Sequence, residues 1–143
     1  MRVLALDIGE RRVGVAFADT AHGVSVPLVV LPANEVETRA PSFRRIVEDH
    51  EPDLLLAGRP LTMAGEEGPQ ARRVEAFAEK LAAACGLPLE FTDERLSSTQ
   101  AKQILREQGM SEKQMRGKID CVAASLFLQA WLDGHAAPTM GAL

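Results

Sequence analysis

The most constraining feature of this 143-residue sequence is the apolar run Val3–Ile8, which one carboxylate, Asp7, interrupts. Such a run predicts a short buried β-strand. A buried Asp is costly unless a cation, a hydrogen-bond donor or water meets it. Gly9 favours a turn, and the apolar stretch 13–18 predicts an antiparallel return strand. The hairpin therefore presents Asp7 at the rim of a sheet, where it either caps a turn or takes part in chemistry.

The rest of the chain predicts the fold class. A third strand is expected over 24–31, at a sheet edge because it contains Pro27. Apolar residues at helical spacing predict helices over 41–50, 69–85, 99–108 and 118–133, and short apolar runs predict strands over 53–58 and 87–92. Three antiparallel strands followed by strands that alternate with helices predict an α/β fold, with one mixed five-stranded sheet and helices on both faces.

The domain organisation follows from length and local composition. We expect a single domain over 1–143, with a loose tail from about 135 to 143. The polar segment 109–117 is predicted to be a mobile loop that closes over a substrate or inserts at a branch. Cys85 and Cys121 are predicted to be free thiols of the core, rather than a disulfide or a zinc site.

Composition narrows the classes of partner. The net charge of -4 excludes a basic surface over the whole protein, so any nucleic-acid surface must be local. Aromatic residues make up only 4% of the chain, which disfavours binding by many stacked bases. The sequence contains no signal-peptide pattern and no apolar run of the roughly 20 residues that a membrane span needs. We therefore expect a cytoplasmic protein.

Two further acids follow elements that should converge with the strand of Asp7. Glu94 comes directly after the predicted strand 87–92, and Asp120 lies in the first turn of the predicted helix 118–133. Small residues one turn on, at 123 and 124, would let this helix approach the sheet and direct Asp120 at the strand ends. A simpler interpretation is that Asp120 only favours the positive end of its helix.

Three neighbouring carboxylates repel one another unless cations or a proton offset the charge. Mg²⁺ shares its ligands between carboxylates, water and phosphate, and two such ions can bind both the attacking and the leaving oxygen of a phosphodiester. No His lies at a ligand spacing, which disfavours zinc. The hypothesis is that Asp7 lies between two Mg²⁺ or Mn²⁺ ions, while Glu94 and Asp120 each hold one of them.

Basic residues flank each of these acids and the end of the predicted strand 53–58. Any one of them could belong to an ordinary solvated surface. As a set beside three acids, they predict a positive rim suited to a nucleic-acid backbone. The candidate nucleic-acid-binding residues are Arg11, Arg12, Arg59, Arg95, Arg116 and Lys118.

Four motifs, in this order and spacing, resemble a known family. They are Leu6-Asp7-Ile8-Gly9 with Gly14-Val15-Ala16, Gly58-Arg59-Pro60 with Met63 and Gly65, Asp93-Glu94-Arg95-Leu96-Ser97, and Lys118-Ile119-Asp120 with Ala123-Ala124. Together they resemble the YqgF/RuvX family of bacterial Holliday junction resolvases, which are also described as nucleases that mature the ends of pre-16S ribosomal RNA. The resemblance covers nearly the whole chain. One departure is Ala64, where many relatives have Asp.

The resemblance implies an RNase H-like fold, a cytoplasmic divalent-metal nuclease that is often a homodimer, and metal-binding acids at Asp7, Glu94 and Asp120. The resulting hypothesis is an endonuclease that hydrolyses phosphodiester bonds in structured nucleic acid. The substrate is either Holliday junction DNA, in recombination and repair, or the 5′ end of pre-16S rRNA, in ribosome biogenesis; the residues do not choose between them.

Two alternative functions stay open. One is a non-catalytic module that binds nucleic acid or associates with the ribosome. The other is an actin-like ATP-binding module, because an Asp-x-Gly hairpin also occurs in the phosphate loop of those proteins. The second is disfavoured because actin-like ATPases need two lobes and a much longer chain.

Overall fold

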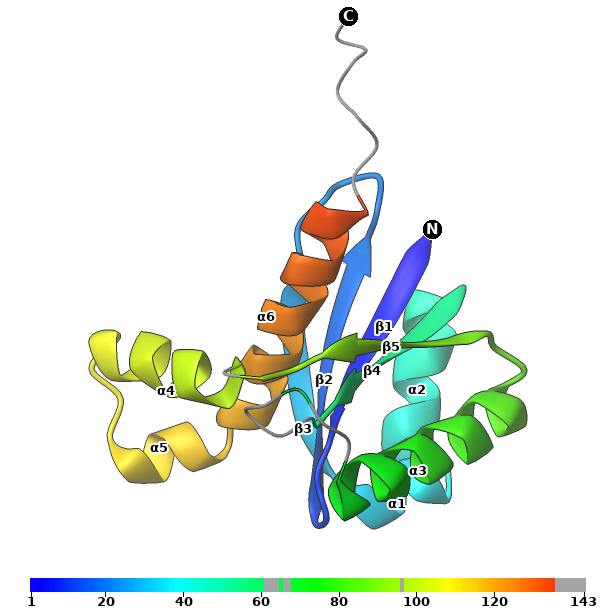
Figure 1. Ribbon diagram of the computed structural model, residues 1–143, viewed down its shortest axis with the longest axis horizontal. Coiled ribbons are helices and arrows are strands. Elements are labelled where there is room, and N and C mark those ends of the chain that lie inside the picture. Colours follow the sequence, from blue (N-terminus) through cyan, green and yellow to red (C-terminus); the bar gives the residue numbers. More distant parts are fainter. Residues whose placement is uncertain (61–64, 66–67, 96, 136–143) are drawn as a thin grey trace, which may run out of the picture.

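The computed structural model describes residues 1–60, 65, 68–95 and 97–135. Its five strands form one sheet in the order β3-β2-β1-β4-β5, which Figure 1 shows in ribbon form. β1 pairs antiparallel with β2 and parallel with β4, while β2 pairs antiparallel with β3 and β4 parallel with β5. The strands are β1 (Arg2–Ile8), β2 (Arg12–Asp19), β3 (Val26–Pro32), β4 (Leu54–Arg59) and β5 (Leu89–Asp93). The predicted mixed sheet is confirmed, with the strand of Pro27 at an edge.

Helices cover both faces of this sheet. The described helices are α1 (Ala33–Glu37), α2 (Pro41–His50), α3 (Pro69–Cys85), α4 (Ser97–Glu107), α5 (Glu112–Arg116) and α6 (Ile119–Gly134). Alternate residues of β1 enter two different cores. Leu4 and Leu6 pack with α2 and α3 on one face, whereas Val3 and Ala5 pack with α6 on the other. Asp7 has the same parity as Val3 and Ala5, so it lies on the face that α6 covers.

The predicted mobile loop over 109–117 is wrong, because most of this segment forms α5. Ser111 begins the helix with a capping box: its hydroxyl accepts from the Gln114 backbone N–H at 3.3 Å, and the Gln114 side-chain oxygen accepts from the Ser111 N–H at 2.8 Å. Met115 is buried. A five-residue helix is too short to produce a periodic apolar pattern, and the short α1 is missed for the same reason.

Several smaller predictions can be compared with the structure. Cys85 and Cys121 are free thiols, and Trp131 of α6 packs in the core between this helix and the sheet. No described helix is both long and apolar enough to span a membrane. Of the predicted loose tail only His135 is described; residues 136–143 lie outside the described part of the chain, as do Met63, Ala64 and Leu96 of the sequence motifs. The single domain stays a prediction.

Candidate active site

The site is built around Asp7, near the end of the central strand β1. Its antiparallel partner on β2 is Gly14. On the other side, Leu6 pairs with Ala57 of β4, which Gly58 follows. Asp7 therefore has glycine in both neighbouring strands, and neither neighbour contributes a side chain that could cover it.

The two glycines make room for the other two acids. A Cβ added at Gly14 would lie 2.1 Å from both the carbonyl carbon and the carbonyl oxygen of Asp120. A Cβ added at Gly58 would lie 2.4 Å from Oε2 of Glu94 and 2.8 Å from Cε2 of Phe127. Gly14 thus allows the first turn of α6 to contact β2, and Gly58 gives space to the Glu94 carboxyl group. Together they form a glycine cradle around Asp7.

This role of the glycines was not among the predictions, which attributed the close approach of the helix to Ala123 and Ala124. Both alanines are fully buried, but they lie one turn beyond the point of closest approach. Glycine inside a strand is a known indication of a close backbone approach. Gly14 and Gly58 could have been recognised on that ground.

The electrostatics show that the three acids converge. The pKa of Asp7 is raised to about 9, chiefly by burial and also by the charge of Glu94, a hydrogen bond to Glu94 and the charge of Asp120. Burial also raises the pKa of Glu94, although its hydrogen bond with Asp7 lowers it. Burial likewise raises the pKa of Asp120, although the neighbouring Arg12 partly offsets this increase. The structure thus brings the three predicted acids within electrostatic reach of one another.

The same contacts describe how the acids are arranged. Asp7 and Glu94 are joined by the carboxyl–carboxyl hydrogen bond, and Oδ2 of Asp120 lies 3.2 Å from Nε of Arg12. In the part of the chain that the structure describes, no group of three or more His, Cys, Asp or Glu side chains is placed so that it could hold a metal ion. The chemistry of the three side chains nevertheless suits Mg²⁺ or Mn²⁺, because all three are carboxylates and these hard cations prefer oxygen ligands.

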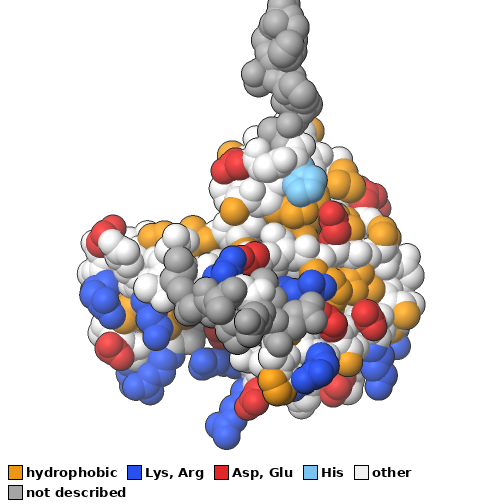
Figure 2. Space-filling view, in the orientation of Figure 1, with side chains coloured by type: hydrophobic (Ala, Val, Ile, Leu, Met, Phe, Trp, Pro, Cys, Tyr) orange, Lys and Arg blue, Asp and Glu red, His pale blue; other side chains and the backbone are white. Residues whose placement is uncertain are grey.

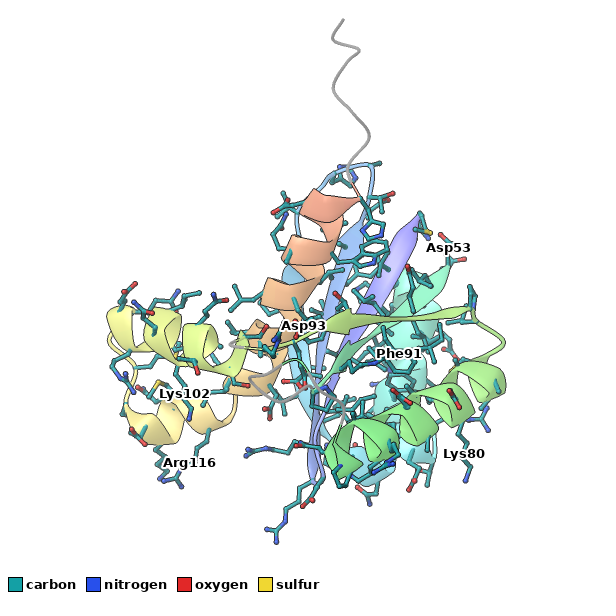
Figure 3. The ribbon with its side chains drawn as sticks, viewed as in Figure 1. Asp53, Lys80, Phe91, Asp93, Lys102 and Arg116 are labelled. Carbon is teal, nitrogen blue, oxygen red and sulfur yellow. The ribbon has the colours of Figure 1, made fainter. Side chains whose placement is uncertain are left out.

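The six predicted basic residues divide into three that form ion pairs within the described part of the chain and three that are exposed and form none there. Arg12 pairs with Asp120, and Arg95 with Asp93, whose nearest atoms are 2.7 Å apart. Arg59 lies 3.3 Å from Glu75 and 5.0 Å from the centre of the Phe91 ring. Arg11, Arg116 and Lys118 are exposed. Figure 2 shows Lys and Arg side chains along the lower margin of this face, and Figure 3 places Arg116 on α5.

Solved structures with the same architecture define the class of fold. RuvC of T. thermophilus in complex with a Holliday junction substrate matches with a TM-score of 0.54 and 13% identity, over 96% of this chain and 98% of that one. The Fowlpox virus resolvase in complex with Holliday junction DNA matches with a TM-score of 0.55 and 10% identity, over 94% and 98% of the two chains. The protein therefore has the RuvC-like, RNase H-like α/β fold that the motifs implied.

Sequence comparison identifies the family within that fold. Residues 1–134 match the family model described as "RuvX: Holliday junction resolvase". A "Putative pre-16S rRNA nuclease" of Anaeromyxobacter sp. (strain Fw109-5) is 44% identical over 135 residues, which cover 94% of this chain and 98% of the relative. One of the same name from Chloroflexus aggregans is 41% identical over 136 residues, covering 95% and 96%. The chain therefore belongs to the RuvX family of nucleases, and the predicted family is confirmed.

Proposed function

We propose that this chain is a divalent-metal-dependent endonuclease that hydrolyses phosphodiester bonds in structured nucleic acid. The observation that best supports it is the convergence of Asp7, Glu94 and Asp120 at the glycine cradle, since mutually repelling acids that are partly buried favour a cation. The family description names Holliday junctions and the relatives are named for pre-16S rRNA, so both are candidate substrates. A homodimer and a cytoplasmic location stay predictions.

Asp7, Glu94 and Asp120 would hold Mg²⁺ or Mn²⁺, with Asp7 shared between two ions. When bound, such cations stabilise negative charge on the phosphate and make water a stronger nucleophile at neutral pH. The chain's own part is to supply three anionic oxygen donors from a rigid sheet edge. Asp7 and Glu94 must release the proton of their hydrogen bond, and Asp120 must turn from Arg12. Cleavage of the bond between phosphorus and the 3′ oxygen, with this oxygen as the leaving group, would give products with 5′ phosphates.

Six basic residues would position the substrate backbone. Arg11 and Arg12 lie where the β1–β2 turn enters β2. Arg59 ends β4 and Arg95 follows β5, while Arg116 and Lys118 precede α6. The ion pairs of Arg59 and Arg95 support this role for these two residues, because a guanidinium that is already oriented loses less freedom when it binds a phosphate.

The proposed activity is tested by cleavage of two labelled substrates, a four-way DNA junction and a precursor 16S RNA fragment, each with Mg²⁺ and with Mn²⁺. Glu94→Gln and Asp120→Asn are each expected to reduce cleavage more than about 100-fold, because even outer-shell partners of a metal contribute about 10–100-fold. The matched control is Glu48→Gln, which neutralises an exposed acid on α2. Strong binding by the unmodified protein without cleavage under either metal would favour the non-catalytic binding module instead.

Glu75 is expected to act as a positioning residue for Arg59, although it was not among the predicted site residues. Glu75→Gln keeps the shape of the side chain and removes the charge 3.3 Å from Arg59. We expect KM for nucleic acid to rise about fivefold, as for the loss of a contact of about 1 kcal/mol, while kcat changes less than about twofold. Steady-state kinetics with Glu79→Gln, an exposed acid on the same helix, as the control check this. A fall in kcat with an unchanged KM would contradict it.

A further inference from the structure

The segment 97–118 differs in charge from the rest of the molecule. It contains α4, α5 and the connections up to Lys118, and we call it the basic arm. Five Lys and Arg residues and two Glu residues give it a formal charge of +3, in a chain whose net charge is -4. All seven side chains are exposed: Lys102, Arg106, Glu107, Glu112, Lys113, Arg116 and Lys118.

The basic arm is attached at both ends to the candidate active site. At its start the Ser97 backbone N–H donates to the carbonyl of Glu94 at 3.1 Å. At its end Lys118 precedes α6, whose first turn contains Asp120. The arm is also ordered, because Ala101 and Leu105 of α4 are buried and α4 packs on α6. A ligand bound to the basic arm would therefore keep a fixed position relative to Glu94 and Asp120.

The surface of the basic arm fits a polyanion that is recognised by charge rather than by bases. None of its five cations forms an ion pair with another described residue. Figure 2 shows Lys and Arg side chains gathered on this lobe, and Figure 3 places Lys102 on α4 and Arg116 on α5. The segment contains no aromatic residue, so it offers no platform on which bases could stack. Phosphate contacts by Lys and Arg carry position and affinity without sequence information.

We propose that the basic arm binds the sugar–phosphate backbone of the double helix that flanks the cleaved strand, and that it positions this strand at Asp7, Glu94 and Asp120. The inference rests on the proposed nuclease function, and it adds Lys102, Arg106 and Lys113 to the nucleic-acid-binding residues. The flanking helix can be DNA or RNA, since both present the same backbone phosphates.

Binding without cleavage tests the role of the basic arm. We compare the unmodified protein with Lys102→Gln/Lys113→Gln/Arg116→Gln, measuring the affinity for a short DNA duplex and the same RNA duplex in EDTA over a range of salt concentrations. The arm variant is expected to bind at least about 10-fold more weakly. The slope of its log affinity against log salt concentration should be less steep by about one for each phosphate contact removed. If the substitutions weaken binding to one duplex more than to the other, that difference shows whether the flanking helix is DNA or RNA.

A charge-matched control variant is Arg44→Gln/Arg45→Gln/Lys80→Gln, whose residues are exposed on α2 and α3 at the opposite face of the sheet. It should keep the parent's affinity and salt dependence, and thermal melting checks that both variants fold. The proposal is overturned if the unmodified protein binds neither duplex, if the arm variant binds within about twofold of it, or if the control loses as much affinity. The nuclease proposal fails in a different way: the unmodified protein would then bind the duplex through the basic arm but would not cleave nucleic acid.

Discussion

Asp7→Asn is expected to abolish cleavage and, at the same time, to stabilise the metal-free protein at neutral pH. The Asn side chain has nearly the same shape but cannot supply an anionic oxygen to the proposed metal site, so we expect the rate to fall more than about 100-fold. The gain in stability has a different cause. Burial, Glu94 and Asp120 all disfavour the ionised form of Asp7 in the folded chain, and an amide is not subject to that penalty.

The pH dependence follows from the direction of this shift. The pKa of Asp7 is raised from 3.8 to about 9 on folding, so between these values the folded state binds more protons than the unfolded state. Stability then decreases as pH rises through this window. The stabilising contribution of the protonated carboxyl group is fully present below the unfolded pKa and is lost as pH rises through the folded pKa.

The measurement is the melting temperature in EDTA at several pH values, together with a cleavage assay in Mg²⁺. The unmodified protein should melt at progressively lower temperature from about pH 5 to pH 9, and Asp7→Asn should show a flatter profile. Glu48→Gln is the control, and it should leave both the profile and the cleavage unchanged. An Asp7→Asn protein that folds and still cleaves near the parent rate would exclude Asp7 from the active site.

Gly14→Ala is the second substitution with a large expected effect, and it acts through packing. Its Cβ would lie 2.1 Å from the carbonyl group of Asp120 and 2.5 Å from the backbone nitrogen of Cys121. Backbone atoms cannot rotate away, so the first turn of α6 must move off the sheet. We expect a loss of about 3 kcal/mol or more in unfolding free energy, at the upper end for overpacking, together with loss of cleavage as Asp120 leaves Asp7.

Two other glycines provide the controls for this substitution. Gly58→Ala would meet chiefly the side chains of Glu94 and Phe127, so it should impair cleavage more than stability. Gly134→Ala, at the end of α6, meets nothing within 4 Å and should be neutral or slightly stabilising. Chemical denaturation and cleavage of the three variants give the comparison. If Gly14→Ala and Gly134→Ala are equally stable and active, the close contact between α6 and β2 does not exist.

Much of the fold could be predicted because β1 and α6 follow simple periodicities. The parity of Asp7 in β1 and the place of Asp120 in the first turn of α6 bring the two residues to one face of the sheet. What could not be predicted depends on contacts between distant segments. The 3.3 Å contact between Arg59 and Glu75 joins a strand end to a helix, and no local pattern specifies it. The short α5 depends on one capping box and on the burial of Met115 rather than on a repeating apolar face.

The basic residues show the same limit at the site itself. Their placement beside the acids in sequence predicts a positive rim, but Arg12 and Arg95 lie in ion pairs with Asp120 and Asp93. Charge patterns along a chain therefore indicate which groups lie near one another. They do not indicate which cations are already paired, because pairing depends on side-chain direction in the folded protein.

The proposed function depends on Asp7, Glu94 and Asp120 together holding divalent cations. The most direct measurement is the anomalous scattering of Mn²⁺ in crystals of the unmodified protein soaked with MnCl₂, with Asp7→Asn crystals soaked in the same way. We expect Mn²⁺ peaks bounded by carboxylate oxygens of these three residues, and we expect these peaks to be absent or much weaker in the variant. Mn²⁺ bound only elsewhere, or three carboxylates that stay empty while the soaked protein cleaves its substrate, would contradict it.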